Sequence, residues 1–412
     1  MSDDKEIVVV SACRTAIGSF GGTLAKGKTK LSPTGKFDAP TLASIVMKEA
    51  MDRVSLDPSM IDDVRFGCCL EPIDAMNVAR CGAYMAGVPT SVPAVTIDRV
   101  CISGMSAITS GIHQIKAGFS DIVLAGGTEA MSMVPYVVQE ARWGCRLQDK
   151  QFADGLIHGL HAGSVYMPYK GRKYIMGETA EFLAEKHDMT REQLDEIALK
   201  SHNGAENATK EGKFKDEIVP VEVLRRKKDP LIFDKDEHFR PGLTMENLSK
   251  LRPAFKKDGI VTAGNSSGIN DGAAAMVVMT KEKADELGMK PLAKITGIGM
   301  GACDPWFMGE SPVPAVRDLL KRTGRSLEDF ERIEVNEAFA SQYLACEIEL
   351  GLNRDLTNVH GSGIGLGHPV GCTGARIMTT LIYDMIHENL HTGLATLCGG
   401  GGVSQAVVIE RD

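Results

Sequence analysis

The stretch Pro93-Ala94-Val95-Thr96-Ile97-Asp98-Arg99-Val100-Cys101-Ile102-Ser103-Gly104-Met105-Ser106-Ala107 decides how this chain folds. Ala94 to Ile97 favours a short strand, and the apolar residues after Cys101 recur at helical spacing. Cys101 is therefore expected where a strand passes into the N-terminus of a helix. Unpaired N–H groups there favour an anion, so we expect the pKa of this thiol to fall below ~8.5 and to give a nucleophile. The alternative, on this stretch alone, is a buried and inert cysteine.

The composition is that of an ordinary globular protein. The 412 residues are 43% hydrophobic and 24% charged, and this length predicts two or three domains. The net charge of −8 argues against nucleic acid as a partner. No apolar run approaches the ~20 residues of a membrane span, and we expect no signal peptide. Ten cysteines without a C-x-x-C pair indicate reduced thiols, no metal site and a cytoplasmic protein.

The second half of the chain repeats the first. The strand at 7–10 resembles the one at 292–296, the helix at 40–54 resembles the one at 313–322, and the helix after Cys101 resembles the one at 371–390. Residues 134–262 are densely charged and indicate an inserted layer over the core. The pattern predicts an α/β protein of two βαβαβ halves, each with a mainly parallel sheet between helices. In such duplicated folds, corresponding strand ends of both halves converge on one site.

Four stretches would converge under this duplication. The first holds Cys101, and each of the others places a polar residue in a turn bordered by glycine or alanine. They are Asn336-Glu337-Ala338-Phe339-Ala340, Gly365-Leu366-Gly367-His368-Pro369-Val370-Gly371 and Cys398-Gly399-Gly400-Gly401. Taken singly, His368 is a turn histidine, Asn336 a helix cap and Cys398 a core cysteine. Their joint placement at repeated strand ends favours a shared site.

Together these residues make a complete set for acyl transfer with carbon–carbon bond making or breaking. Cys101 is the candidate nucleophile and His368 its base. Backbone N–H groups of Cys101 and Gly400 can stabilise an oxyanion. Asn336, through a water, and His368 can stabilise an enolate, while Cys398 can carry a proton to and from carbon or sulfur.

These residues resemble the motifs of the thiolase family. Asp98 to Gly104 is similar to its nucleophile motif, and Asn336-Glu337-Ala338-Phe339 to its NEAF signature. The stretches 367–376 and 398–401 resemble its GHP and C-x-GG motifs. Residues 263–272 resemble the segment that contacts the CoA pantetheine, and Met176 to Glu181 resembles the loop-domain motif. The resemblance runs from about Ile7 to Glu410.

The resemblance implies the thiolase fold, with two βαβαβαββ halves in five α-β-α-β-α layers and an inserted loop domain. It implies an N-terminal half at 1–133 and 263–284, a CoA-binding loop domain at 134–262 and a C-terminal half at 285–412. It implies a ping-pong reaction through acyl-Cys101, with CoA as a substrate and no permanently bound cofactor. It also implies a homodimer or homotetramer. The residues that it assigns to CoA and substrate are Ser267, Met176, Ala338 and Phe339.

Some positions depart from the usual family pattern. Asp98 stands where Asn is usual, 360–365 where an apolar run is usual, and Ile175 where short-chain biosynthetic members have His. These departures resemble a subgroup from anaerobic aromatic degradation, the benzoylsuccinyl-CoA thiolases, which work with a small zinc-ribbon/OB-fold partner. Lys170 and Arg172, among tyrosines in 166–174, are then expected to bind a carboxylate on an aromatic acyl group. The alternative is that these cations serve CoA phosphates or solvate a loop.

Other functions stay open on the sequence. Within the family, the alternatives are an acetyl-CoA acetyltransferase acting on acetoacetyl-CoA and a generic 3-ketoacyl-CoA thiolase. A decarboxylating ketosynthase shares the fold but lacks the second cysteine, so Cys398 argues against it. A non-enzymatic CoA-binding scaffold would have lost one of the four catalytic residues, and none is lost here.

Overall fold

The structure, a computed structural model, describes residues 5–412. A large mixed sheet crosses the molecule in the order β13-β14-β15-β12-β1-β11-β5-β3-β4. The strands of the first half are β1 (Ile7–Thr15), β3 (Asp63–Gly67), β4 (Ala94–Ile97), β5 (Ile122–Ala130) and β11 (Asn270–Thr280). Those of the second half are β12 (Ala293–Ala302), β13 (Arg332–Val335), β14 (Thr392–Gly399) and β15 (Val403–Glu410).

The predicted duplication is confirmed, because the strands of both halves follow one order. Counted along each half, the first strand, the last, the last but one and the second are neighbours in this order: β1-β11-β5-β3 and β12-β15-β14-β13. The two halves join where β1 pairs antiparallel with β12, with Val8 opposite Lys294. Two short strands extend this sheet, β2 (Gly18–Ser19) beside β11 and β8 (Ile218–Val219) beside β1.

The prediction of mainly parallel sheets is wrong. β3 runs parallel to β4 and β5, but β11 runs antiparallel to both β1 and β5. In the second half β15 is likewise antiparallel to its two neighbours. The last strand of each half does not follow a crossover helix, which is the connection that makes strands parallel. β15 instead follows β14 through a tight turn in which Gly401 and Gly402 have φ of +82° and +83°.

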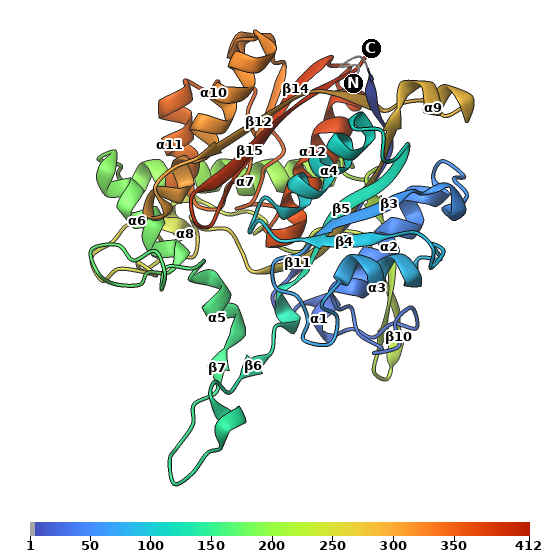
Figure 1. Ribbon diagram of the computed structural model, residues 1–412. Coiled ribbons are helices and arrows are strands. Elements are labelled where there is room, and N and C mark those ends of the chain that lie inside the picture. The colour runs from blue at the N-terminus through green and yellow to red at the C-terminus, as the bar shows by residue number, and fades with distance from the viewer. Residues whose placement is uncertain (1–4) are drawn as a thin grey trace.

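Helices enclose and separate the two halves of the sheet, which gives the five predicted layers (Figure 1). α2 (Ala39–Asp52) and α3 (Val78–Met85) cover the outer face of the first half. α10 (Pro312–Thr323) covers that of the second half, with α11 (Ala340–Leu350) beside it. α4 (Ser103–Lys116) and α12 (Val370–His387) lie between the halves and contact each other and strands of the sheet.

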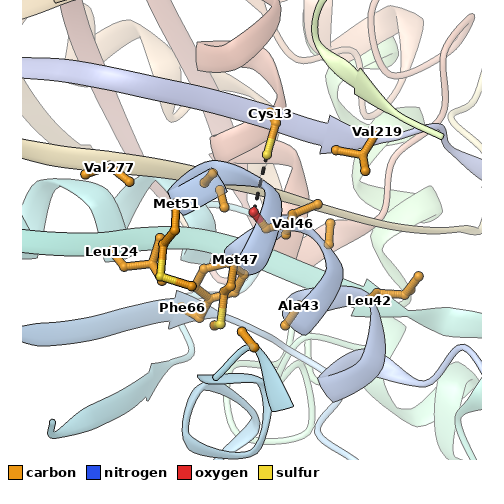
Figure 2. Packing of buried hydrophobic residues seen from close by; sticks show 14 of the residues in the cluster. Cys13, Leu42, Ala43, Val46, Met47, Met51, Phe66, Leu124, Val219 and Val277 are labelled. Atoms are coloured by element: carbon orange, nitrogen blue, oxygen red, sulfur yellow. Dashed lines mark hydrogen bonds between the residues drawn. The ribbon is translucent and has the colours of Figure 1, made fainter. Parts of the chain in front are cut away.

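The outer face of the first half shows how the core is built (Figure 2). α2 turns Met47 and Met51 toward Phe66 of β3 and Leu124 of β5, and all four side chains are buried. The thiol of Cys13 donates a hydrogen bond to the Val46 carbonyl at 3.3 Å. Cys13 is thus a buried structural cysteine, which is the alternative interpretation of Cys101.

The long segment between β5 and β11 contributes only β8 to the large sheet, as expected of an insertion, whereas its bounds at 134–262 stay a prediction. It holds α5 (Gly155–Leu160), α6 (Met176–Lys186), α7 (Arg191–Glu211), α8 (Met245–Ser249) and the ribbon of β9 (Val221–Arg225) and β10 (Lys228–Phe233). An arm built on β6 (Tyr136–Val137) and β7 (Ala153–Asp154) projects from the body (Figure 1). The two remaining helices are α1 (Thr23–Lys26) and α9 (Lys281–Glu286). Among the described residues, no helix is both long and apolar enough to span a membrane.

Candidate active site

Cys101 lies in a strained turn between β4 and α4, as the sequence predicts. Val100, the residue before it, has φ of +51°, which is rare for a β-branched residue and costs of order 1–3 kcal/mol. Local hydrogen bonds hold this conformation. Asp98 Oδ1 accepts the Val100 N–H at 2.8 Å, and the Val100 carbonyl accepts from the Ser103 hydroxyl at 2.5 Å. Strain that is stored next to a thiol marks this turn as a candidate functional site.

The thiol of Cys101 is almost fully buried, with 2% exposure. Burial raises its pKa to about 12, although hydrogen bonds from the backbone N–H groups of Gly400 and Cys101 oppose the rise. The expectation of a lowered pKa is therefore wrong for the chain without substrate. α4 begins only at Ser103, and desolvation outweighs its N-terminus. That these two N–H groups stabilise an oxyanion stays a prediction.

The turn that carries His368 is fixed by the first half of the chain. The Oδ1 of Asn270, on β11, accepts the His368 backbone N–H at 2.9 Å. Gly367 has φ of +105°, and a Cβ at this position would lie 2.7 Å from the Asn270 side chain. Glycine is thus needed for both the conformation and the close approach. The histidine of the second half is positioned by a strand of the first.

The tautomer of His368 follows from its contact with Thr373. The Thr373 hydroxyl donates to the Pro369 carbonyl at 2.9 Å, so at 2.7 Å it must accept from Nδ1–H of His368. Nε2 then carries the lone pair, and it has no hydrogen-bond partner among the described residues. Burial, with the charge of Arg376, lowers the pKa of His368 to about 3, which keeps the ring neutral. The ring can therefore accept a proton at Nε2.

Asn336 and Cys398 lie at the ends of β13 and β14, and both are 0% exposed. The side-chain nitrogen of Asn336 lies 3.4 Å from Nδ1 of His368, and its Oδ1 has no partner among the described residues. Burial raises the pKa of Cys398 well above its usual range, and the nearby Cys101 thiol adds to the rise. The Cys398 thiol is therefore protonated, and the Asn336 side chain lies beside His368.

A cavity of about 490 Å³ opens over Cys101 and His368. Four predicted CoA and substrate residues, Ser267, Met176, Ala338 and Phe339, line it together with those two catalytic candidates. Gly400 adjoins the nucleophile turn, since a Cβ there would lie 3.0 Å from Cγ1 of Val100. The lining is mostly apolar, and the backbone N–H of Ser267 donates to the Ala338 carbonyl at 3.0 Å.

Lys170 and Arg172 do not line this cavity. They line a separate cleft of about 270 Å³, in which Arg172 pairs with Glu178 at 2.6 Å. Of the tyrosines in this stretch, Tyr169 stacks on Trp306 and lines the same cleft, Tyr174 is buried against Phe182, and Tyr166 is 89% exposed. The cation–carboxylate pair in this cleft forms within the protein itself.

Sequence reasoning missed several residues of the site. Thr373 sets the tautomer of His368 from within a motif that the sequence does show, so its position was visible but its role was not. His238 and Arg240 line the cavity from the insertion, and Phe255 lines both the cavity and the neighbouring cleft. No spacing in the sequence indicates these three residues, because only the packing of the insertion brings them to the cavity.

A buried thiol and a neutral histidine, held by two related halves over one cavity, define a thiol-dependent acyltransferase of the α/β class. Comparison with known families then identifies the chain. Residues 7–282 match the model for the thiolase N-terminal domain, and residues 289–411 match the model for the thiolase C-terminal domain. The chain belongs to the thiolase family, and the predicted thiolase fold is confirmed.

Individual relatives agree over nearly the full length. An acetyl-CoA acetyltransferase of Syntrophomonas wolfei is 45% identical over 98% of this chain and 99% of the relative. The crystal structure of the Bacillus anthracis acetyl-CoA acetyltransferase superposes with a TM-score of 0.92 at 46% identity, covering 98% of both chains. The crystal structure of a human mitochondrial 3-ketoacyl-CoA thiolase in complex with CoA superposes with a TM-score of 0.91 at 39% identity, covering 99% of this chain and 98% of the other.

The protonation state of His368 gives a first prediction. Between pH 8 and pH 5 its ring should stay neutral with the hydrogen on Nδ1, because its pKa lies near 3. Two-bond ¹⁵N–¹H NMR spectra of histidine-labelled protein, assigned with His368→Gln, would show this directly. Protonation of Nε2 with a midpoint near 6.5, the ordinary value for histidine, would contradict the tautomer assignment.

Proposed function

We propose that the chain catalyses CoA-dependent cleavage of a short 3-oxoacyl-CoA, such as acetoacetyl-CoA, and the reverse condensation, through an acyl-Cys101 intermediate. The observation that carries this proposal is the unpartnered, unprotonated Nε2 of His368 in the cavity of the Cys101 thiol. Nε2 takes the thiol proton as the sulfur attacks the 3-oxo carbon. The N–H groups of Cys101 and Gly400, which adjoin the nucleophile turn, stabilise the oxyanion.

Cys398 completes both halves of the ping-pong reaction. When the bond between C2 and C3 breaks, the acetyl-CoA enolate takes a proton from the Cys398 thiol, while His368 and Asn336 stabilise the enolate oxygen. The Cys398 thiolate then removes the proton of an incoming CoA thiol, which attacks the acyl-Cys101 thioester. The Cys101 sulfur leaves and regains its proton from Nε2 of His368. Every group returns to its starting state, and no cofactor is consumed.

The cavity favours CoA with an uncharged acyl group. Arg240 is an exposed cation of its lining, at a position suited to a CoA phosphate, while the rest of the lining is mostly apolar. The relatives at 45% and 46% identity are named acetyl-CoA acetyltransferases. The aromatic carboxylated substrate finds no support, because Arg172 pairs with Glu178 outside the cavity. Cytoplasmic placement and the zinc-ribbon partner stay predictions.

The expected homo-oligomer is supported by the arm at 134–160. Its side chains Trp143, Leu147 and Phe152 are 84%, 107% and 75% exposed, an unusual apolar display for a free surface. We infer that the arm packs against a second copy of the chain. The acidic chain offers no reason to place nucleic acid there.

The roles of the two cysteines give a second prediction. Cys101→Ser should lower turnover by several orders of magnitude and form no acyl adduct, while CoA binding stays unchanged. Cys398→Ala should also lose turnover, yet an activated thioester should still acylate Cys101, since this step needs only His368. Intact-mass spectrometry detects the adduct. Turnover of Cys101→Ser within tenfold of wild type, a barrier change of only ~1.4 kcal/mol, would sink the assignment.

The role of Arg172 gives a third prediction. Arg172→Ala should change kcat/KM less than threefold for both acetoacetyl-CoA and a 3-oxoacyl-CoA that ends in a carboxylate, because the side chain lies outside the cavity. Loss of the enolate absorbance measures both rates. A drop of ten- to 100-fold on the carboxylated substrate alone would instead restore the carboxylate-binding hypothesis, at ~1.5–3 kcal/mol for a charged hydrogen bond.

The arm gives a fourth prediction. Replacing Trp143 and Leu147 together by serine should reduce the assembled mass in static light scattering. Phe119→Ser is a matched control, because Phe119 is 82% exposed in the turn after α4, outside the arm, and should leave the mass unchanged. An unchanged mass for the arm variant would remove the arm from the assembly.

A further inference from the structure

Glu129 is a buried carboxylate beside the site that the acyl-transfer steps do not use. It is the penultimate residue of β5, is 0% exposed, and is held by backbone N–H groups and the Cys68 thiol rather than by a cation. Oε2 accepts from the N–H of Cys69 at 3.0 Å and from that of Gly371 at 2.9 Å. Oε1 accepts from the N–H of Leu70 at 3.1 Å. These three charge-assisted bonds fix the carboxylate and connect the backbone at Cys69 and Leu70 to that at Gly371.

The first connection made by Glu129 is to the turn that carries His368. Gly371 lies three residues beyond His368, in the first turn of α12, where a negative charge is favoured by the helix dipole. The fit is close, because a Cβ on Gly371 would lie 2.7 Å from Oε2 of Glu129 and 2.8 Å from Cα of Cys68. The turn that carries the catalytic base is thus anchored to the carboxylate at its helical end.

The second connection made by Glu129 is to the turn that carries Cys101. The Cys69 thiol, on the residue whose N–H binds Glu129, donates to the Val100 carbonyl at 2.9 Å. Val100 holds the strained, positive-φ conformation immediately before Cys101. Glu129 therefore holds residues 68–70 in place, and the Cys69 thiol of this segment supports the nucleophile turn.

We propose that Glu129 is a positioning residue for acyl transfer, whose carboxylate clamps the His368 turn to the segment that supports Cys101. The inference rests on the proposed function, because it concerns the geometry between nucleophile and base. A displacement of about 1 Å in such a pair can cost ~10²-fold in rate. Glu129 itself touches neither substrate nor the reacting atoms.

The test is Glu129→Gln, which keeps the shape but turns an NH₂ group toward backbone donors. We expect kcat to fall about 100-fold, with KM and CoA affinity within threefold of wild type. Iodoacetamide modification of Cys101, followed by mass spectrometry, should slow at least tenfold, since a positioned base contributes ~10²–10⁴-fold. A merely structural role would lower the melting temperature without changing either rate in the folded protein.

The matched control is Glu217→Gln. Glu217 is an equally buried carboxylate, but its partners are Arg14 at 2.6 Å and Thr380 at 3.2 Å, away from both catalytic turns. It should lose stability while keeping kcat. If Glu129→Gln does not fold, Glu129→Asp decides, because it keeps the charge but is too short to reach all three donors. Normal turnover and normal Cys101 reactivity in the folded variant overturn the clamp. A wild-type protein that is inactive on every 3-oxoacyl-CoA overturns the proposed function instead.

Discussion

The close crossing of the two central helices is the contact on which the site depends. Gly104 of α4 faces the backbone of α12, where a Cβ would lie 2.9 Å from the Gly371 carbonyl and 3.0 Å from the Ala375 nitrogen. On the other side, a Cβ on Gly374 would lie 2.5 Å from the Met105 nitrogen. Because Cys101 lies two residues before α4 and His368 two residues before α12, this backbone contact brings nucleophile and base to one cavity. A larger side chain at the crossing would separate the two halves where their chemistry meets.

Burial sets the electrostatic state of the resting site. It raises the pKa of Cys101 and lowers that of His368, so both shifts disfavour a thiolate–imidazolium pair in the free chain. Proton transfer therefore becomes favourable only when a thioester or ketone supplies an oxygen on which the developing charge can rest. The N–H groups of Cys101 and Gly400 are the proposed donors to that oxygen. A thiol that stays protonated until substrate binds is also protected from oxidation and from adventitious electrophiles.

Much of this arrangement is predictable from the sequence, because local patterns encode it. The strand at Ala94–Ile97 has the predicted bounds, and Cys101 and Cys398 lie at strand ends as expected. The expectation is wrong for His368, which follows a loop between α11 and α12 rather than a strand. The antiparallel last strands were not predictable, because strand direction depends on how the chain returns to the sheet. The pKa of Cys101 was missed because helix position argues for a lower value, and only the structure shows how strongly burial opposes it. Arg172 was given a ligand-binding role because its partner, Glu178, becomes visible only in the fold.

The duplication is broken where the two halves do different chemistry. In the first half, β4 leads directly into the Cys101 turn, whereas its counterpart in the second half is a single bridge between Ile333 and Thr357. The chain then follows a buried, glycine-rich loop to His368. Ser201 of the inserted helix α7 contacts this loop. Its hydroxyl donates to Glu337 and accepts from the N–H of Gly365 at 2.9 Å.

The unusual sequence of this loop follows from that contact. A Cβ on Gly365 would lie 2.3 Å from the Ser201 carbonyl, and one on Gly361 would lie at the same distance from it, so α7 can approach only because both residues are glycine. An intact strand at this position would use its backbone groups within the sheet and leave none for the insertion. The lost strand therefore couples the insertion, which lines the cavity through Met176, to the loop that carries the base.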